Sequence, residues 1–143
     1  MQHAIHRALA LTRQSAARER TAEITTTGRR SGTARRIEIW FYRVGERNYL
    51  SGLPGQRGWY ANLLAHPAFT LHLKNGVRAD LPATARPVTD PAERHRVMAE
   101  IVEDLNQPHN PARIAQPACL EDWLRASPLI EIVFDERPTA HRA

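Results

Sequence analysis

The sequence predicts an α+β protein built on an antiparallel β-barrel of about six strands, with an N-terminal helix and short peripheral helices. Three observations lead to this prediction: short runs with period-two alternation recur, turn residues separate them at hairpin spacing, and no βαβ alternation is present. A chain of 143 residues is long enough to bury a proper core. We therefore expect one domain over residues 1–143.

The first 19 residues are expected to form one amphipathic helix, because apolar side chains recur on one side and arginines lie outside that side. The barrel is then expected over residues 21–135. Its first strand is residues 21–27, a run rich in β-branched side chains, which favour strands.

The second strand, residues 36–44, alternates strictly. One side carries Ile37, Ile39 and Phe41, and the other carries Glu38, Trp40 and Tyr42. Because both sides are bulky, we expect one to face the core and the other a ligand or a partner. Gly45 and Glu46 form the turn into the next strand, residues 47–51.

The second half of the chain continues with alternating helices and strands. A Gly/Pro-rich loop at 51–58 precedes a helix at 59–66, which Pro67 ends. Asn75-Gly76 predicts a two-residue hairpin between strands 68–73 and 77–88. Asp90 and Pro91 predict the start of a helix that runs to about residue 106. A Pro-rich loop at 107–118, a helix at 120–125 and a closing strand at 129–134 complete the pattern.

A dense basic cluster follows the first strand. Gly28 and Gly32 predict a tight loop with exposed backbone donors. Arg29, Arg30, Arg35 and Arg36 crowd this loop with guanidinium groups. Because neighbouring like charges repel unless an anion or carboxylates compensate them, the cluster predicts an anionic ligand.

The composition narrows the class of protein. The formal net charge of +5 indicates a negatively charged partner, and nucleic acid remains an alternative at this point. Cys119 is the only cysteine, so the chain has no internal disulfide and no thiolate zinc set, and we expect a reducing cytoplasm. The seven histidines lack ligand spacing, so we expect no metal site. No apolar run is long enough to span a membrane.

Aromatic side chains lie close in sequence to the arginines. Trp40, Tyr42, Trp59 and Tyr60 can form a platform for a planar heterocycle with an anionic tail. Ordinary packing of a short helix accounts for Trp59 and Tyr60 equally well. The residues alone leave both interpretations open.

The motif TTTGRRSG, followed by Arg35 and then by WYANLLAHP about thirty residues later, resembles the deazaflavin-dependent nitroreductase and quinone reductase family. The resemblance covers about residues 21–90. It implies a split β-barrel that binds coenzyme F420, whose phosphate and oligoglutamate tail are anionic. It also implies hydride transfer from reduced F420 to a small electron-poor acceptor such as a quinone, an activated alkene or a nitro compound.

The resemblance also assigns residues. Four residues match the loop that binds the tail, namely Arg29, Arg30, Ser31 and Arg35. The residues expected beside the deazaflavin ring are Ile39, Trp40 and the backbone of Ser51, Gly52 and Leu53, and Trp59 is expected to begin the helix that closes the pocket. No catalytic acid is assigned.

Three features depart from the family pattern. Glu38 stands where proline is common, the loop after Ser51 is short, and the C-terminal tyrosines of one branch have no counterpart. Glu38 could accept a ring N–H, or it could indicate FMN or heme instead of F420. A second class of function, a non-catalytic binder of another anionic ligand or of nucleic acid, stays open. We favour a small-molecule acceptor, no nucleic acid, no membrane insertion and a homodimer.

Overall fold

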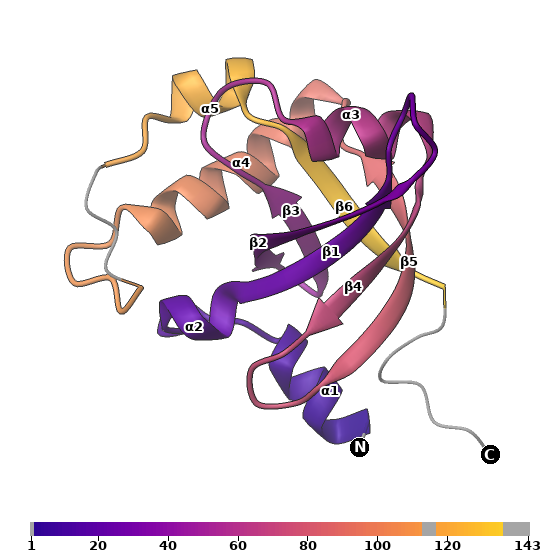
Figure 1. Ribbon diagram of the computed structural model, residues 1–143. Coiled ribbons are helices and arrows are strands. Elements are labelled where there is room, and N and C mark those ends of the chain that lie inside the picture. The colour runs from indigo at the N-terminus through magenta and orange to yellow at the C-terminus, as the bar shows by residue number, and fades with distance from the viewer. Residues whose placement is uncertain (1, 113–116, 136–143) are drawn as a thin grey trace.

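The computed structural model describes residues 2–112 and 117–135 and has a closed antiparallel barrel at its centre. Its strands are β1 (Thr21–Thr27), β2 (Ala34–Val44), β3 (Arg47–Ser51), β4 (Ala68–Leu73), β5 (Ala79–Pro87) and β6 (Leu129–Phe134). Around the barrel they lie in the order β1-β2-β3-β6-β5-β4 (Figure 1). The predicted barrel of about six strands is confirmed.

Within the described residues, five helices surround the barrel. They are α1 (Gln2–Leu9), α2 (Ala17–Arg20), α3 (Gly58–Ala65), α4 (Pro91–Leu105) and α5 (Leu120–Ala126). The predicted start of α4 is confirmed, because the Asp90 carboxylate accepts the backbone N–H of Glu93 at 3.0 Å. The predicted loop at 107–118 lies only partly within the described residues.

The N-terminal segment differs from the expectation of one helix, since residues 10–16 separate α1 from α2. The cause is Arg20, whose side chain is only 2% exposed. Its guanidinium group donates to the carbonyls of Ser15 at 2.9 Å and Thr12 at 3.3 Å and pairs with Asp104 of α4 at 2.5 Å. A buried cation needs such acceptors. A continuous helix would already have used most of these carbonyls.

The hairpins show how local sequence sets register. The turn at Gly45 is tight, with φ of 63° at the glycine, and Val44 pairs with Arg47 as predicted. The β4–β5 connection is longer than the predicted two-residue turn, because Leu73 pairs with Ala79. The Asn75 side chain instead donates to the carbonyls of Arg18 at 2.7 Å and Thr21 at 3.2 Å. This turn therefore holds the end of α2 and the start of β1.

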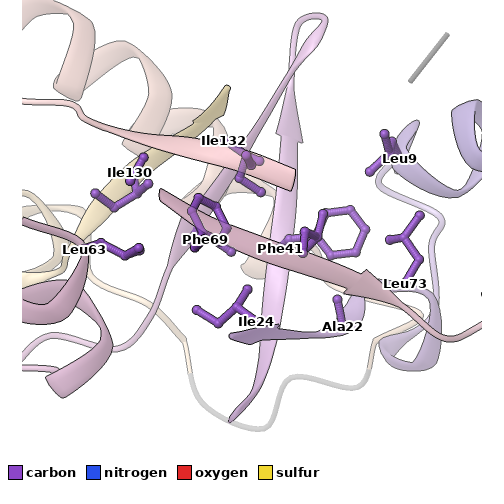
Figure 2. Close-up of a cluster of buried hydrophobic side chains, with 13 residues drawn as sticks. Leu9, Ala22, Ile24, Phe41, Leu63, Phe69, Leu73, Ile130 and Ile132 are labelled. Carbon is purple, nitrogen blue, oxygen red and sulfur yellow. The ribbon is translucent and has the colours of Figure 1, made fainter. Parts of the chain in front are cut away.

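Two apolar clusters stabilise the fold. The first fills the barrel and contains Leu9, Ile24, Phe41, Phe69 and Ile130, among others (Figure 2). The second lies between the outer side of β2 and β3 and the helices α4 and α5. It includes Tyr42, Tyr49, Val97, Ile101 and Trp123. Alternation along β2 explains this division, because Phe41 points inward and Tyr42 outward. The outward aromatic side of β2 thus packs partly against the chain's own helices, and Trp40 and Tyr42 on the same side also line a cavity.

Strands β2 and β3 separate partway along their length. Their pairing extends from Val44–Arg47 to Phe41–Leu50, and residues 34–40 of β2 pair only with β1. On its other side, β3 pairs with β6 from Asn48 to Ser51. This separation opens the wall of the barrel near α3 and α5, which Figure 1 shows at the same end of the molecule as the tip of the β1–β2 hairpin.

Candidate functional site

A cavity of about 510 Å³ lies where β2 and β3 separate. Its wall combines the end of β2, the loop after β3, and parts of α3, α4 and α5. The lining residues that matter most below are Ile39, Trp40, Tyr42, Ser51, Gly52, Leu53, Arg57, Trp59, Cys119, Asp122 and Trp123. Most of these groups are apolar or aromatic, with few polar ones, which is typical of a small-molecule pocket.

Four aromatic side chains from three elements form the cavity wall. Trp40 and Tyr42 come from β2, Trp59 from the start of α3, and Trp123 from α5. The Trp59 and Tyr60 rings meet edge to face, with centroids 6.2 Å apart, and both pack on the barrel core. Trp59 therefore both packs against the barrel core and lines the cavity. Burial raises the pKa of Tyr42, so its phenol stays protonated at neutral pH.

The loop after β3 is fixed by hydrogen bonds at both ends. The Ser51 hydroxyl donates to the Pro128 carbonyl at 2.7 Å, and the Gly55 N–H donates to the Ala126 carbonyl at 3.0 Å. Arg57 closes the loop by donating to the Leu53 carbonyl at 2.8 Å. Because these bonds hold the backbone in place, Gly52 and Leu53 present a preformed wall.

The predicted tight turn after β1 is present. The Gly28 N–H donates to the Thr33 carbonyl at 2.8 Å, and the Gly32 N–H donates to the Gly28 carbonyl at 2.9 Å. Gly32 has φ of 71°, which favours glycine. A Cβ atom at Gly28 would lie 2.5 Å from the Ser31 hydroxyl, so a side chain there would displace Ser31. The two glycines therefore set the shape of the turn.

Three of the arginines in the cluster keep their guanidinium groups available. Arg29, Arg30 and Arg35 are exposed, and their side chains form no hydrogen bond or ion pair with any residue that the structure describes. Arg36 differs, because its Nε donates to Glu23 at 2.5 Å. The term "cationic loop" below means residues 28–35 with these three free arginines. Such a loop is well suited to phosphate or carboxylate groups.

Asn62 joins the cationic loop to the cavity, and the sequence interpretation did not single it out. Its side-chain oxygen accepts the Arg29 N–H at 3.0 Å, and its amide nitrogen donates to the Thr26 hydroxyl at 3.2 Å. Asn62 lies one turn after Trp59 on α3. The motif WYANL contained this signal, since it places one amide side chain about one helical turn after the tryptophan.

Glu38 does not line the cavity. It stands opposite Glu23 across β1 and β2, and the Lys74 ammonium donates to both carboxylates, at 2.5 Å for Glu38 and 2.8 Å for Glu23. The bonds to Lys74 and to Arg36 lower the pKa of Glu23 to about 2. Glu38 therefore pairs with Lys74. This pair explains a carboxylate at this strand position without a hydrogen bond to the N–H of a cofactor ring.

The structure divides the predicted site residues into three groups. Ile39, Trp40, Ser51, Gly52, Leu53 and Trp59 line one cavity. Arg29, Arg30, Ser31 and Arg35 lie in or beside the neighbouring turn, and Glu38 lies apart with Lys74. Tyr42 was expected as part of an aromatic platform, and the residues that sequence reasoning missed include Arg57, Leu105, Asp122 and Trp123. Most of them come from α4 and α5, whose contact with β2 is visible only in three dimensions.

Other kinds of site find no support in the described part of the chain. Within residues 2–112 and 117–135, no group of three or more His, Cys, Asp or Glu side chains could hold a metal ion. Across the same residues, no helix combines the length and apolar character needed to cross a bilayer.

The fold and the site together define a split β-barrel with an aromatic cavity near a cationic loop. The sequence profile of the F420H(2)-dependent quinone reductase family matches residues 8–111, most of the chain. The chain belongs to this family. It is thus an oxidoreductase that uses F420, as the TTTGRRSG and WYANLLAHP motifs implied.

Solved structures with low sequence identity share the fold. A conserved hypothetical protein from Mycobacterium tuberculosis is 18% identical with a TM-score of 0.62, covering 87% of this chain and 83% of its own. An F420 reductase is 16% identical with a TM-score of 0.56, covering 81% and 86%. A heme storage protein from Vibrio cholerae is 13% identical with a TM-score of 0.59, covering 85% and 87%. No curated protein matches the chain.

The residues present fit coenzyme F420. Aromatic and aliphatic side chains around Trp40 and Trp59 suit a planar deazaflavin, and the fixed backbone after Ser51 suits its polar edge. The free guanidinium groups of Arg29, Arg30 and Arg35 suit a phosphate and carboxylates. Both parts of the site lie at one end of the barrel and are joined through Asn62.

Proposed function

We propose that the protein transfers a hydride from reduced coenzyme F420 to a small, planar, electron-poor acceptor in the cavity between β2 and β3. Quinones are the first candidates, and activated alkenes and nitro compounds are further ones. The observation that carries the proposal is the union of an aromatic cavity with a cationic loop whose arginines have no partner among the described residues.

The chain's own residues would bind the cofactor, orient its ring and exclude water from the cavity. Reduced F420, when bound, supplies two electrons and a proton as hydride. Trp40 and Trp59 would hold the ring against the wall formed by Gly52 and Leu53. Arg29, Arg30 and Arg35 would hold the tail and leave the ring free to align with the acceptor. Tyr42 lines the cavity as a neutral phenol.

Titration of the purified protein with F420, FMN and heme tests the cofactor. We expect F420 to change its fluorescence on binding and FMN and heme to bind weakly, because each lacks an oligoglutamate tail for the cationic loop. Oxidation of F420H2 should then require both the protein and a quinone. Tight FMN or heme binding without any response to F420 would overturn the proposal.

We also propose that the protein is a cytoplasmic homodimer. The single free cysteine, Cys119, is exposed, which suits a reducing compartment. Leu53 and Leu64 are 67% and 51% exposed, and a second copy could cover them. Light scattering should give about twice the chain mass, and a value near 16.2 kDa at micromolar concentration would reject the dimer.

A further inference from the structure

The outer edge of β2 is open over residues 34–40. This stretch pairs only with β1, since the pairing with β3 begins at Phe41. In an antiparallel ladder, every second residue directs its N–H and C=O away from the neighbouring strand. Among the residues that the structure describes, no backbone or side-chain group bonds to those outward groups. We call this stretch the free edge.

The free edge is accessible and does not lie under a helix. Residues 34–38 are all exposed, and Ile39 and Trp40 are partly buried because they enter the cavity wall. Exposed strand edges are usually blocked by charge, by bulges or by covering segments, because they pair readily with other chains. Here the edge carries arginines, which select against cationic and for anionic partners.

The free edge connects the two parts of the site. One end reaches the cavity at Ile39 and Trp40, and the other reaches the cationic loop at Ala34 and Arg35. Seven residues of extended strand measure about 20 Å. A ligand with its planar head in the cavity would therefore direct its tail along this strand toward Arg29 and Arg30.

We propose that the free edge binds the amide-containing, polycarboxylate tail of the ligand by strand addition. This inference rests on the proposed function and adds the chemistry of tail recognition. Amide groups of an extended chain both donate and accept hydrogen bonds, so they can satisfy the outward N–H and C=O groups of β2. The carboxylates of the same chain pair with Arg29, Arg30 and Arg35. A phosphate alone could satisfy the arginines but not the backbone carbonyls.

Charge argues against a second copy of this chain as the occupant. Pairing two free edges would bring two sets of guanidinium groups together, and the only carboxylate in residues 28–40, Glu38, is already bound to Lys74. An oligoglutamate chain carries the complementary charge. The tail is therefore the occupant that both the hydrogen-bonding groups and the charges of this edge favour.

Hydrogen exchange of the backbone amides tests the inference. The protein is compared without ligand, with full-length F420, and with the form that retains the phosphate but carries no glutamate. We expect full-length F420 to slow exchange of the outward amides of residues 34–38 by about tenfold or more, and the glutamate-free form to leave them unchanged. Both forms should protect amides around Gly52 and Leu53. Strand β6, which is paired on both sides, serves as the internal control.

The outcomes separate this inference from the proposed function. If neither form binds, the proposed function fails. If both bind and residues 34–38 show equal protection or none, only strand addition is overturned. Protection of these amides without ligand that grows with protein concentration would mean that a second copy occupies the edge, which also overturns it.

The variants Ile37→Pro and Glu38→Pro provide a second test. Ile37 and Glu38 are neighbours, so one N–H faces β1 and the other faces the free edge. The proline variant that removes the ladder bond should lower the melting temperature, whereas the other should keep it. The variant that stays folded should lose several-fold in affinity for full-length F420 and nothing for the glutamate-free form. Equal affinity for full-length F420 in the parent and in that folded variant would contradict strand addition.

Discussion

At the scale of single residues, the cationic loop is held in shape by few atoms. Gly28 and Gly32 allow a turn that any side chain at Gly28 would disturb, and Asn62 fixes the turn to α3. The side chains of Arg29, Arg30 and Arg35 make no described hydrogen bond or ion pair that would help to hold this shape. Their role and the stability of the turn can therefore be separated experimentally.

Replacing Arg29, Arg30 or Arg35 singly with Ala should weaken F420 binding by about ten- to hundredfold, because each change removes a charge-assisted contact worth about 1.5 to 3 kcal/mol. The melting temperature should hardly change, since exposed arginines contribute little to stability. Fluorescence titration with full-length F420 measures the effect.

The contrasting variant is Trp40→Ala, which alters the cavity wall. It should reduce turnover or acceptor affinity with the full-length and the truncated cofactor alike, with some loss of packing. The arginine variants should match the parent when the cofactor lacks phosphate and glutamates. If they bind full-length F420 as tightly as the parent does, the cationic loop serves another ligand.

Glu23 gives the fold a pH-dependent contribution. Bonds to Lys74 and Arg36 lower its pKa from the ordinary 4.5 to about 2, so folding is favoured when the carboxylate is ionised. The stabilisation is present above pH 4.5 and is lost as the pH falls toward 2. A double-mutant cycle of Glu23→Gln and Lys74→Met, measured by urea unfolding, should show coupling at pH 7 that declines across this range. Coupling that is equal at pH 7 and pH 3 would contradict this account.

At the scale of elements, α3 links the cationic loop to the cavity. Asn62→Ala should reduce F420 affinity about tenfold, because the turn loses the bond to the Arg29 amide and its arginines lose their fixed position. Ala65→Ser changes an exposed residue on the same helix to which no role is given, and it serves as the matched control. Equal affinity for F420 in both variants would show that α3 does not position the loop.

The pair of Arg20 and Asp104 joins the N-terminal segment to α4. Asp104→Ala should lower the free energy of unfolding by about 3 to 5 kcal/mol, because it leaves a buried guanidinium without its carboxylate. Glu103→Ala removes a neighbouring exposed carboxylate that pairs with Arg13 and should cost less than about 1 kcal/mol. Chemical denaturation measures both variants, and similar values for the two would contradict the role given to the buried pair.

At the scale of the whole molecule, local sequence signals predicted the elements well. The bounds of β1, β3, β4 and β6 agree with alternation and turn residues, because these patterns act between near neighbours. The break between α1 and α2 was not predictable, since it depends on Asp104, which lies 84 residues from Arg20. The site shows the same division. The arginines and glycines of the cationic loop could be predicted from the sequence because they are neighbours in the chain. The contribution of Asp122 and Trp123 to the cavity could not, because it depends on how α5 packs near β2.

The position of the ligand head in the cavity is the central claim, and Cys119 offers a direct measurement. It is the only cysteine of the chain, it is exposed, and it lines the cavity. The rate of its alkylation by a small thiol reagent should fall several-fold at saturating F420, and also with a truncated deazaflavin that lacks phosphate and glutamates at a concentration that saturates binding. A rate that stays unchanged while fluorescence shows F420 to be bound would place the cofactor elsewhere and contradict the account.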